Sequence, residues 1–81
     1  MAYAQLLDAY EYAKKLSPAS GSKFVDGHNR LKRMLLGTVN NEDAMNALDR
    51  EQLINVISWS CEYKVVPPHI LLSYVCKLST N

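Results

Sequence analysis

Apolar side chains recur at steps of three and four residues along most of the chain, and this spacing restricts the fold more than any other feature. It places side chains on one face of an α-helix, whereas a half-buried strand needs apolar and polar residues to alternate. No stretch alternates for long enough to form a strand. With 81 residues, the chain suits one domain and is too short for two. We therefore predict an all-α fold, a compact bundle of four or five short helices in a single domain over residues 1–81.

Residues that favour turns divide the expected helices. The helical segments should cover about residues 2–16, 22–36, 41–48, 50–63 and 68–78. Pro18 and its small neighbours break the first periodic run, so residues 17–22 are expected to form a flexible loop. Gly37 is placed to end the second helix in a left-handed conformation. Gly27 weakens the same helix, and a later start with Asp26 as the cap is the alternative.

Hydrogen-bond acceptors stand where several of these helices should begin. Ser22 can cap the second helix, and Asn40 or Asn41 can cap the third. Asp49 is followed three residues later by Gln52, which is the spacing of a capping box. A fresh helix is therefore expected directly after Asp49.

The chain shows no pattern typical of export or of a membrane span. Residues 1–16 lack an early basic residue and an unbroken apolar stretch. The longest apolar runs fall far short of the roughly 20 residues that cross a bilayer. We expect a cytoplasmic protein without a membrane partner, in which Cys61 and Cys76 are reduced thiols.

Charge is distributed unevenly. Residues 1–40 carry six basic and three acidic side chains, a net charge of +3, whereas residues 41–81 carry three basic and five acidic ones, a net charge of −2. The basic cluster comprises Lys23, Arg30, Lys32 and Arg33. Arg30 and Arg33 share a side of the helix, so a track of phosphate contacts is conceivable. A nucleic-acid-binding helical protein using residues 23–33 is therefore the alternative function, although solvated basic faces are common.

The segment 50–63 carries two apolar stripes on different sides. One stripe holds Leu53, Ile54, Ile57 and Cys61, and the other holds Val56, Trp59 and Tyr63. Two interpretations stay open. Either the helix is central and wrapped on both sides with Trp59 as a core anchor, or Trp59 and Tyr63 are partly exposed and dock a partner.

The residues that carry chemistry are poorly placed for catalysis or metal binding. Structural zinc sites bring ligands in close pairs, but 41, 15 and 7 or 8 residues separate the available Cys and His ligands. Cys61 falls on an apolar stripe, where burial makes a thiol inert. The glycines are scattered and form no phosphate-binding loop. We expect no cofactor, no metal and no enzymatic activity.

By elimination, the expected function is stoichiometric binding to a larger protein, as an adaptor or inhibitor. Small accessory proteins of the phage or plasmid type have this size and composition, and a homodimer is compatible with it. The expected partner-binding residues are Val56, Trp59, Tyr63, Arg30, Lys32 and Arg33. The apolar members would anchor the partner, and the cations would orient it.

Overall fold

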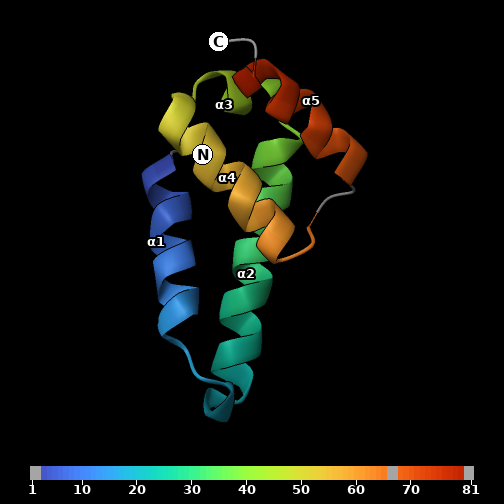
Figure 1. Cartoon of the computed structure of the whole chain (residues 1–81). Helices are drawn as coiled ribbons and strands as arrows, with labels where there is room; N and C mark the ends of the chain where they lie inside the picture. The colour runs from blue at the N-terminus through green and yellow to red at the C-terminus, as the bar shows by residue number, and fades with distance from the viewer. Residues whose placement is uncertain (1–2, 66–67, 80–81) are drawn as a thin grey trace.

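Helices α1 (Tyr3–Lys15) and α2 (Ser22–Val39) form an antiparallel hairpin that spans most of the long axis of the molecule (Figure 1). A 3₁₀ turn, Pro18–Ser20, closes the hairpin within the expected loop, whose flexibility stays a prediction. The computed structural model describes residues 3–65 and 68–79, and it measures 43 × 23 × 17 Å. Ala2, the expected first helical residue, lies outside this described part.

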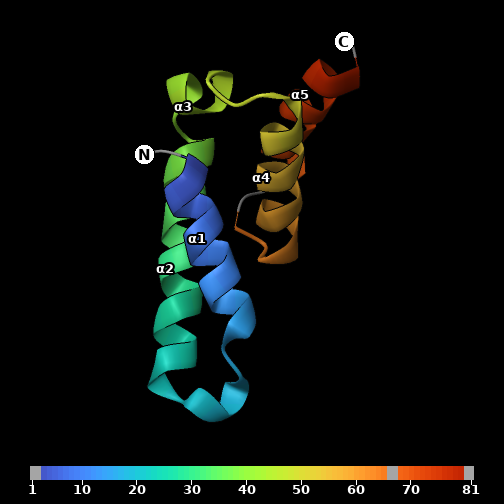
Figure 2. The ribbon, with the colours of Figure 1, turned by 90° about the vertical axis from the view of Figure 1, so that its left-hand side faces the viewer.

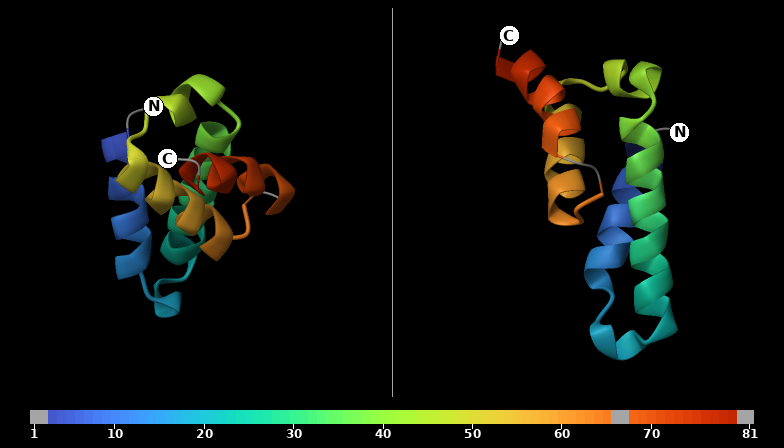
Figure 3. Two further views of the ribbon diagram at one scale, coloured as in Figure 1. Left: turned by 45° about the horizontal axis from the view of Figure 1, so that its top comes forward. Right: turned by 90° about the vertical axis from the view of Figure 1, so that its right-hand side faces the viewer.

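The other helices cover one end of the hairpin. The short helix α3 (Glu42–Asn46) follows α2, and α4 (Arg50–Glu62) and α5 (Pro68–Ser79) form a second layer beside it. Figures 2 and 3 show that this layer reaches only part of the hairpin, so the loop end projects beyond it. Every regular element among the described residues is helical, which confirms the all-α bundle of short helices.

Local hydrogen bonds set the starts of α3 and α4. The Asp49 carboxylate accepts a hydrogen bond from the Gln52 backbone N–H at 2.8 Å, and Gln52 Oε1 accepts one from the Asp49 N–H at 3.2 Å. Asn41 Oδ1 accepts one from the Ala44 N–H at 3.2 Å. Both predicted caps are thus confirmed, with Asn41 rather than Asn40 as the cap of α3.

The expected cap of α2 is wrong. Ser22 is already the first helical residue, and Gly21 occupies the N-cap position without a side-chain hydrogen bond. Gly21 has φ 64° and ψ −121°, a backbone conformation that is essentially restricted to glycine. The sharp turn out of the hairpin loop therefore requires Gly21 and replaces side-chain capping.

Removing the capping box should have a measurable effect. We expect Asp49→Ala to lower the free energy of unfolding by about 1 kcal/mol, because the Gln52 N–H loses its acceptor. Asp49→Asn keeps a side-chain oxygen and should stay close to wild type. Urea denaturation followed by circular dichroism measures both. Equal midpoints for Asp49→Ala and wild type would show that the box contributes nothing to stability.

Gly37 does not end α2, contrary to the sequence-based expectation. The helix continues to Val39, and Asn40 is its C-cap in an ordinary right-handed conformation. Thr38 and Val39 are buried, and a glycine inside a helix costs only about 1 kcal/mol relative to alanine. Burial of the last turn therefore outweighs the weak stop signal at Gly37.

Gly27 has a packing role that its low helix propensity conceals. A Cβ atom at this position would lie 2.5 Å from Leu16 Cδ1 and 3.3 Å from Tyr12 Cε2. The absence of a side chain therefore lets α2 approach α1 closely near the loop end of the hairpin. A side chain at position 27 would require the Leu16 side chain to move.

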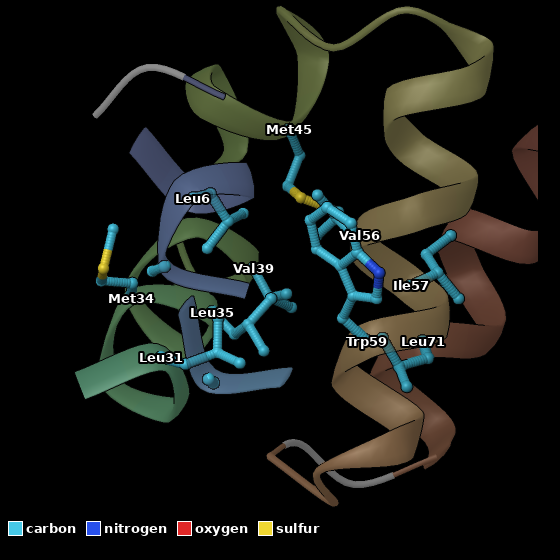
Figure 4. Close-up of a cluster of buried hydrophobic side chains, with 12 residues drawn as sticks. Leu6, Leu31, Met34, Leu35, Val39, Met45, Val56, Ile57, Trp59 and Leu71 are labelled. Carbon is cyan, nitrogen blue, oxygen red and sulfur yellow. The ribbon is translucent and has the colours of Figure 1, made fainter. Parts of the chain in front are cut away.

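Helix α4 is the centre of the core. Figure 4 shows Val56 and Trp59 on the side of α4 that faces α1 and α2, and Ile57 on the side toward α5. The cluster of buried apolar side chains comprises Leu6, Ala9, Ala13, Leu31, Met34, Leu35, Val39, Met45, Val56, Ile57, Trp59 and Leu71. Buried side chains therefore lie on two sides of α4, toward the hairpin and toward α5.

Candidate functional site

Trp59, the expected anchor for a partner, belongs to the core. Its side chain is 6% exposed and stacks between two tyrosines of α1, with ring centroids 4.3 Å from Tyr10 and 5.9 Å from Tyr3. Val56, on the same side of α4, is fully buried. The expectation that Val56 and Trp59 are exposed for docking is wrong, because two tyrosines seven residues apart on α1 enclose the indole. Of the two interpretations left open, the one in which Trp59 is a core anchor is confirmed.

Tyr63 lies half-buried at the C-terminal end of α4. Its ring packs edge-on against Tyr10, with centroids 6.4 Å apart, and against His28 of α2 at 5.6 Å. Burial raises the pKa of the Tyr63 hydroxyl, and the nearby Glu62 carboxylate raises it further. Tyr63 thus closes the aromatic packing between α4 and the hairpin, which leaves only part of its ring for any partner.

The same region should make stability sensitive to alkaline pH. The hydrogen bond from Lys14 to Glu62, at 2.6 Å, raises the pKa of Lys14 above its ordinary value, and burial does the same for the pKa of Tyr63. Both groups hold their protons more tightly in the folded state than in the unfolded state. Their contribution is therefore complete below about pH 10 and is lost as the pH rises through the folded-state pKa values.

We expect the free energy of unfolding, measured by urea denaturation between pH 8 and pH 11, to fall with rising pH. Tyr63→Phe removes one of these groups, and Glu62→Gln removes the carboxylate that raises both pKa values. Each variant should show a shallower fall than wild type. Identical pH dependence in all three proteins would contradict the assignment to Lys14 and Tyr63.

The other predicted stripe of α4 is only partly covered. Ile57 is buried, whereas Ile54 and Cys61, one turn before and one turn after it, are exposed. The expected burial of Cys61 is wrong because α5 covers the Ile57 side of α4 and leaves the adjoining positions in solvent. Cys76 on α5 is also exposed, and both thiols are free.

The four cations of the basic cluster are all exposed on α2, but they do not form one track. Because α2 is continuous, steps of three and four residues assign each cation to a stripe. One stripe consists of Lys23, Asp26, Arg30 and Arg33, and the other consists of Val25, Asn29, Lys32 and Leu36. The first stripe contains a carboxylate, and the second contains two apolar residues.

Val25 and Leu36 are the residues that sequence reasoning missed. Their side chains are 53% and 42% exposed, and they stand at the two ends of the second stripe. Arg33 adjoins this stripe, three residues before Leu36 and four after Asn29. We name Val25, Asn29, Lys32, Arg33 and Leu36 the α2 solvent face. Its signal in the sequence was the spacing of Val25 and Leu36, which places both outside the inward-facing stripe of α2.

The cations of this face are available for contacts with a partner. In the part of the chain that the structure describes, the one ion pair joins Lys14 to Glu62. Four exposed carboxylates, Glu42, Asp43, Asp49 and Glu51, belong to the segment from the start of α3 to the start of α4. Among the described residues, no cation of α2 forms an ion pair, and Asp26 is the one carboxylate on α2 itself.

The structure offers little to hold a metal or a small substrate. Among residues 3–65 and 68–79, no three His, Cys, Asp or Glu side chains are grouped to bind a metal ion. A hollow between α2 and α3 is lined by Gly37, Thr38, Asn41 and Ala44, none of which is titratable. No helix of the described chain combines the length and apolarity needed to cross a bilayer.

Comparison of the chain with protein-family models gave no match, and neither did comparison with curated proteins or with solved structures. Function must therefore be inferred from the exposed surfaces of the molecule. Among these surfaces, the α2 solvent face brings apolar and cationic side chains together on one helix.

Proposed function

We propose that this chain is a non-enzymatic protein-binding module that acts stoichiometrically on a larger protein, as an adaptor or an inhibitor. The α2 solvent face is the observation that supports the proposal. Exposed apolar side chains supply contact area that becomes buried on binding, and cations speed association and fix the orientation. Lys32 and Arg33 lie on this face, and Arg30 lies one turn before Arg33. Val25 and Leu36 take over the anchoring role that Val56 and Trp59 cannot perform.

The α2 helix is well suited to present such a face. Its opposite side carries Leu31 and Leu35, which are fully buried in the core, and Thr38, whose hydroxyl donates a hydrogen bond to the Met34 carbonyl. Core packing therefore fixes the direction in which the exposed side chains project. A preorganised surface loses less conformational entropy on binding than a flexible segment does.

A capture experiment tests the proposal. Wild-type protein is immobilised and exposed to nuclease-treated lysate of the source cell, in parallel with the double variant Lys32→Glu/Arg33→Glu. The control variant Lys15→Glu/Lys64→Glu changes the net charge equally at exposed positions outside the face. We expect wild type and control to retain the same protein in near-equimolar amount, and the Lys32/Arg33 variant to lose it. Equal retention by all three baits, or by none, would contradict the proposal.

Nucleic-acid binding is the second candidate, because Lys23, Arg30 and Arg33 lie along one side of α2. Asp26 lies among them and would oppose phosphate. Three phosphate contacts predict a slope of about −3 for the logarithm of affinity against the logarithm of salt concentration, at about −0.9 per contact. Fluorescence anisotropy with a labelled DNA duplex measures this slope, and Asp26→Asn should strengthen binding. Salt-independent binding, or none, would exclude this candidate.

A further inference from the structure

We infer that the α2 solvent face docks an acidic amphipathic helix of the partner protein, with an apolar residue at each end of the contact and carboxylates between them. This inference rests on the proposed function and names the chemistry of the partner. Three features point to this occupant. They are the separation of the two apolar anchors, the positive charge of the face, and the presence of apolar and cationic side chains in one stripe.

The geometry of the anchors sets the length of the contact. Val25 and Leu36 are eleven residues apart, which is close to three helical turns and about 16 Å at 1.5 Å per residue. They therefore lie on nearly the same side of α2, with Asn29 and Lys32 between them. A helix packed nearly along α2 would meet both anchors with apolar residues of its own about eleven positions apart.

The charge of the face determines what lies between those anchors. Lys32 and Arg33 would face the middle of the docked helix, and α2 as a whole has four cations and a single carboxylate, Asp26. Asp or Glu side chains in the middle of the partner helix would complement this charge. A second copy docked through the same face by a two-fold axis would instead oppose like charges. Charge complementarity therefore favours a different, acidic chain.

The arrangement of residues also argues against a polyanion or a lipid surface as the occupant. Lys32 lies in the same stripe as Val25 and Leu36, whereas an interfacial helix keeps its cations on a polar face separate from its apolar face. Phosphates would leave both aliphatic side chains without a contact, and the face carries no aromatic ring on which a base could stack. An acidic helix with apolar ends offers a complementary group to both aliphatic anchors and to both cations of the face.

Selection from a peptide library tests this inference without assuming a particular partner. A display library of helical peptides, randomised on one face with all residue types, is selected on the folded wild-type protein. We expect enriched sequences to carry Asp or Glu in the middle of the face and apolar residues about eleven positions apart. The absence of enrichment, or enriched sequences without either feature, would overturn the inference.

Variants then locate the bound peptide. Fluorescence anisotropy of an enriched peptide should show affinity at least about tenfold weaker for Leu36→Ser and for Lys32→Glu/Arg33→Glu than for wild type. Leu72→Ser on α5 is the matched control at another exposed leucine and should bind like wild type. Circular dichroism confirms that each variant is folded. Binding that survives both α2 variants would overturn the inference.

Two competitors identify the other classes of occupant. The competitors are single-stranded RNA and vesicles of anionic phospholipid, added at the same concentration of negative charge. We expect both to displace the labelled peptide only weakly. Displacement as strong as that by unlabelled peptide would overturn the inference. If the library selection fails but wild type still captures a protein from lysate, the inference of an acidic helix is refuted and the proposed function is not. Failure of that capture would refute the proposed function itself.

Discussion

Replacing Trp59 with alanine should lower the free energy of unfolding by about 3–5 kcal/mol. The indole is 6% exposed and lies between Tyr3 and Tyr10, so the substitution leaves a cavity between α4 and α1 and removes two stacked ring pairs. A single core in a chain of this size rarely supplies more than about 3–5 kcal/mol in total. We therefore expect the variant to be largely unfolded at 25 °C, as measured by far-ultraviolet circular dichroism.

Ile54→Ala is the matched control on the same helix. Ile54 is 42% exposed, and its truncation should change the free energy of unfolding by no more than about 0.5 kcal/mol. Trp59→Phe keeps an aromatic ring, so its urea midpoint should lie between those of Trp59→Ala and Ile54→Ala. If Trp59→Ala unfolds at the same urea concentration as wild type, the indole is not part of the core and its role in docking must be reconsidered.

Helix starts were predictable where the signal is local. The capping box of Asp49 and Gln52 and the cap at Asn41 involve side chains and backbone groups only three residues apart. Such interactions depend on the sequence within one turn and not on the rest of the fold. The start at Gly21 was missed because a backbone conformation, and not a side-chain acceptor, makes that turn.

The coverage of α4 could not be derived from its own sequence. The two stripes of residues 50–63 were visible, but which positions are buried depends on Tyr3 and Tyr10 of α1 and on the placement of α5. Cys61 is exposed for the same reason, although it follows the buried Ile57 by one turn. Tertiary packing between distant segments decided these positions.

The cations of the candidate site were predicted from the sequence, and its apolar residues were not. Arg30, Lys32 and Arg33 were recognised as an exposed basic group, because charged side chains are rarely buried without a partner. Val25 and Leu36 were not considered as contact residues, although their spacing places them outside the buried side of α2. The predicted helix over residues 22–36 already places both in one stripe with Lys32, and the structure adds that both are exposed.

Leu35 and Leu36 allow stability and binding to be separated at adjacent positions. Leu35 is fully buried and Leu36 is 42% exposed, so the same substitution acts once in the core and once at the surface of α2. Leu35→Ala should lower the free energy of unfolding by about 2–5 kcal/mol, because a cavity forms between α2 and its neighbours. Leu36→Ala should change it by no more than about 0.5 kcal/mol.

The two variants should also differ in binding, in the reverse order. Leu36→Ala removes an anchor from a folded protein. It should therefore lower the affinity for an enriched acidic peptide under conditions where the circular dichroism spectra of the variant and of wild type are equal. Any loss of binding by Leu35→Ala should follow its loss of helical signal as temperature is raised, because that leucine does not reach the α2 solvent face. If Leu36→Ala binds the peptide as tightly as wild type, the peptide does not use Leu36 as an anchor. If Leu35→Ala is as stable as wild type, the packing of the hairpin against α4 does not depend on this side chain.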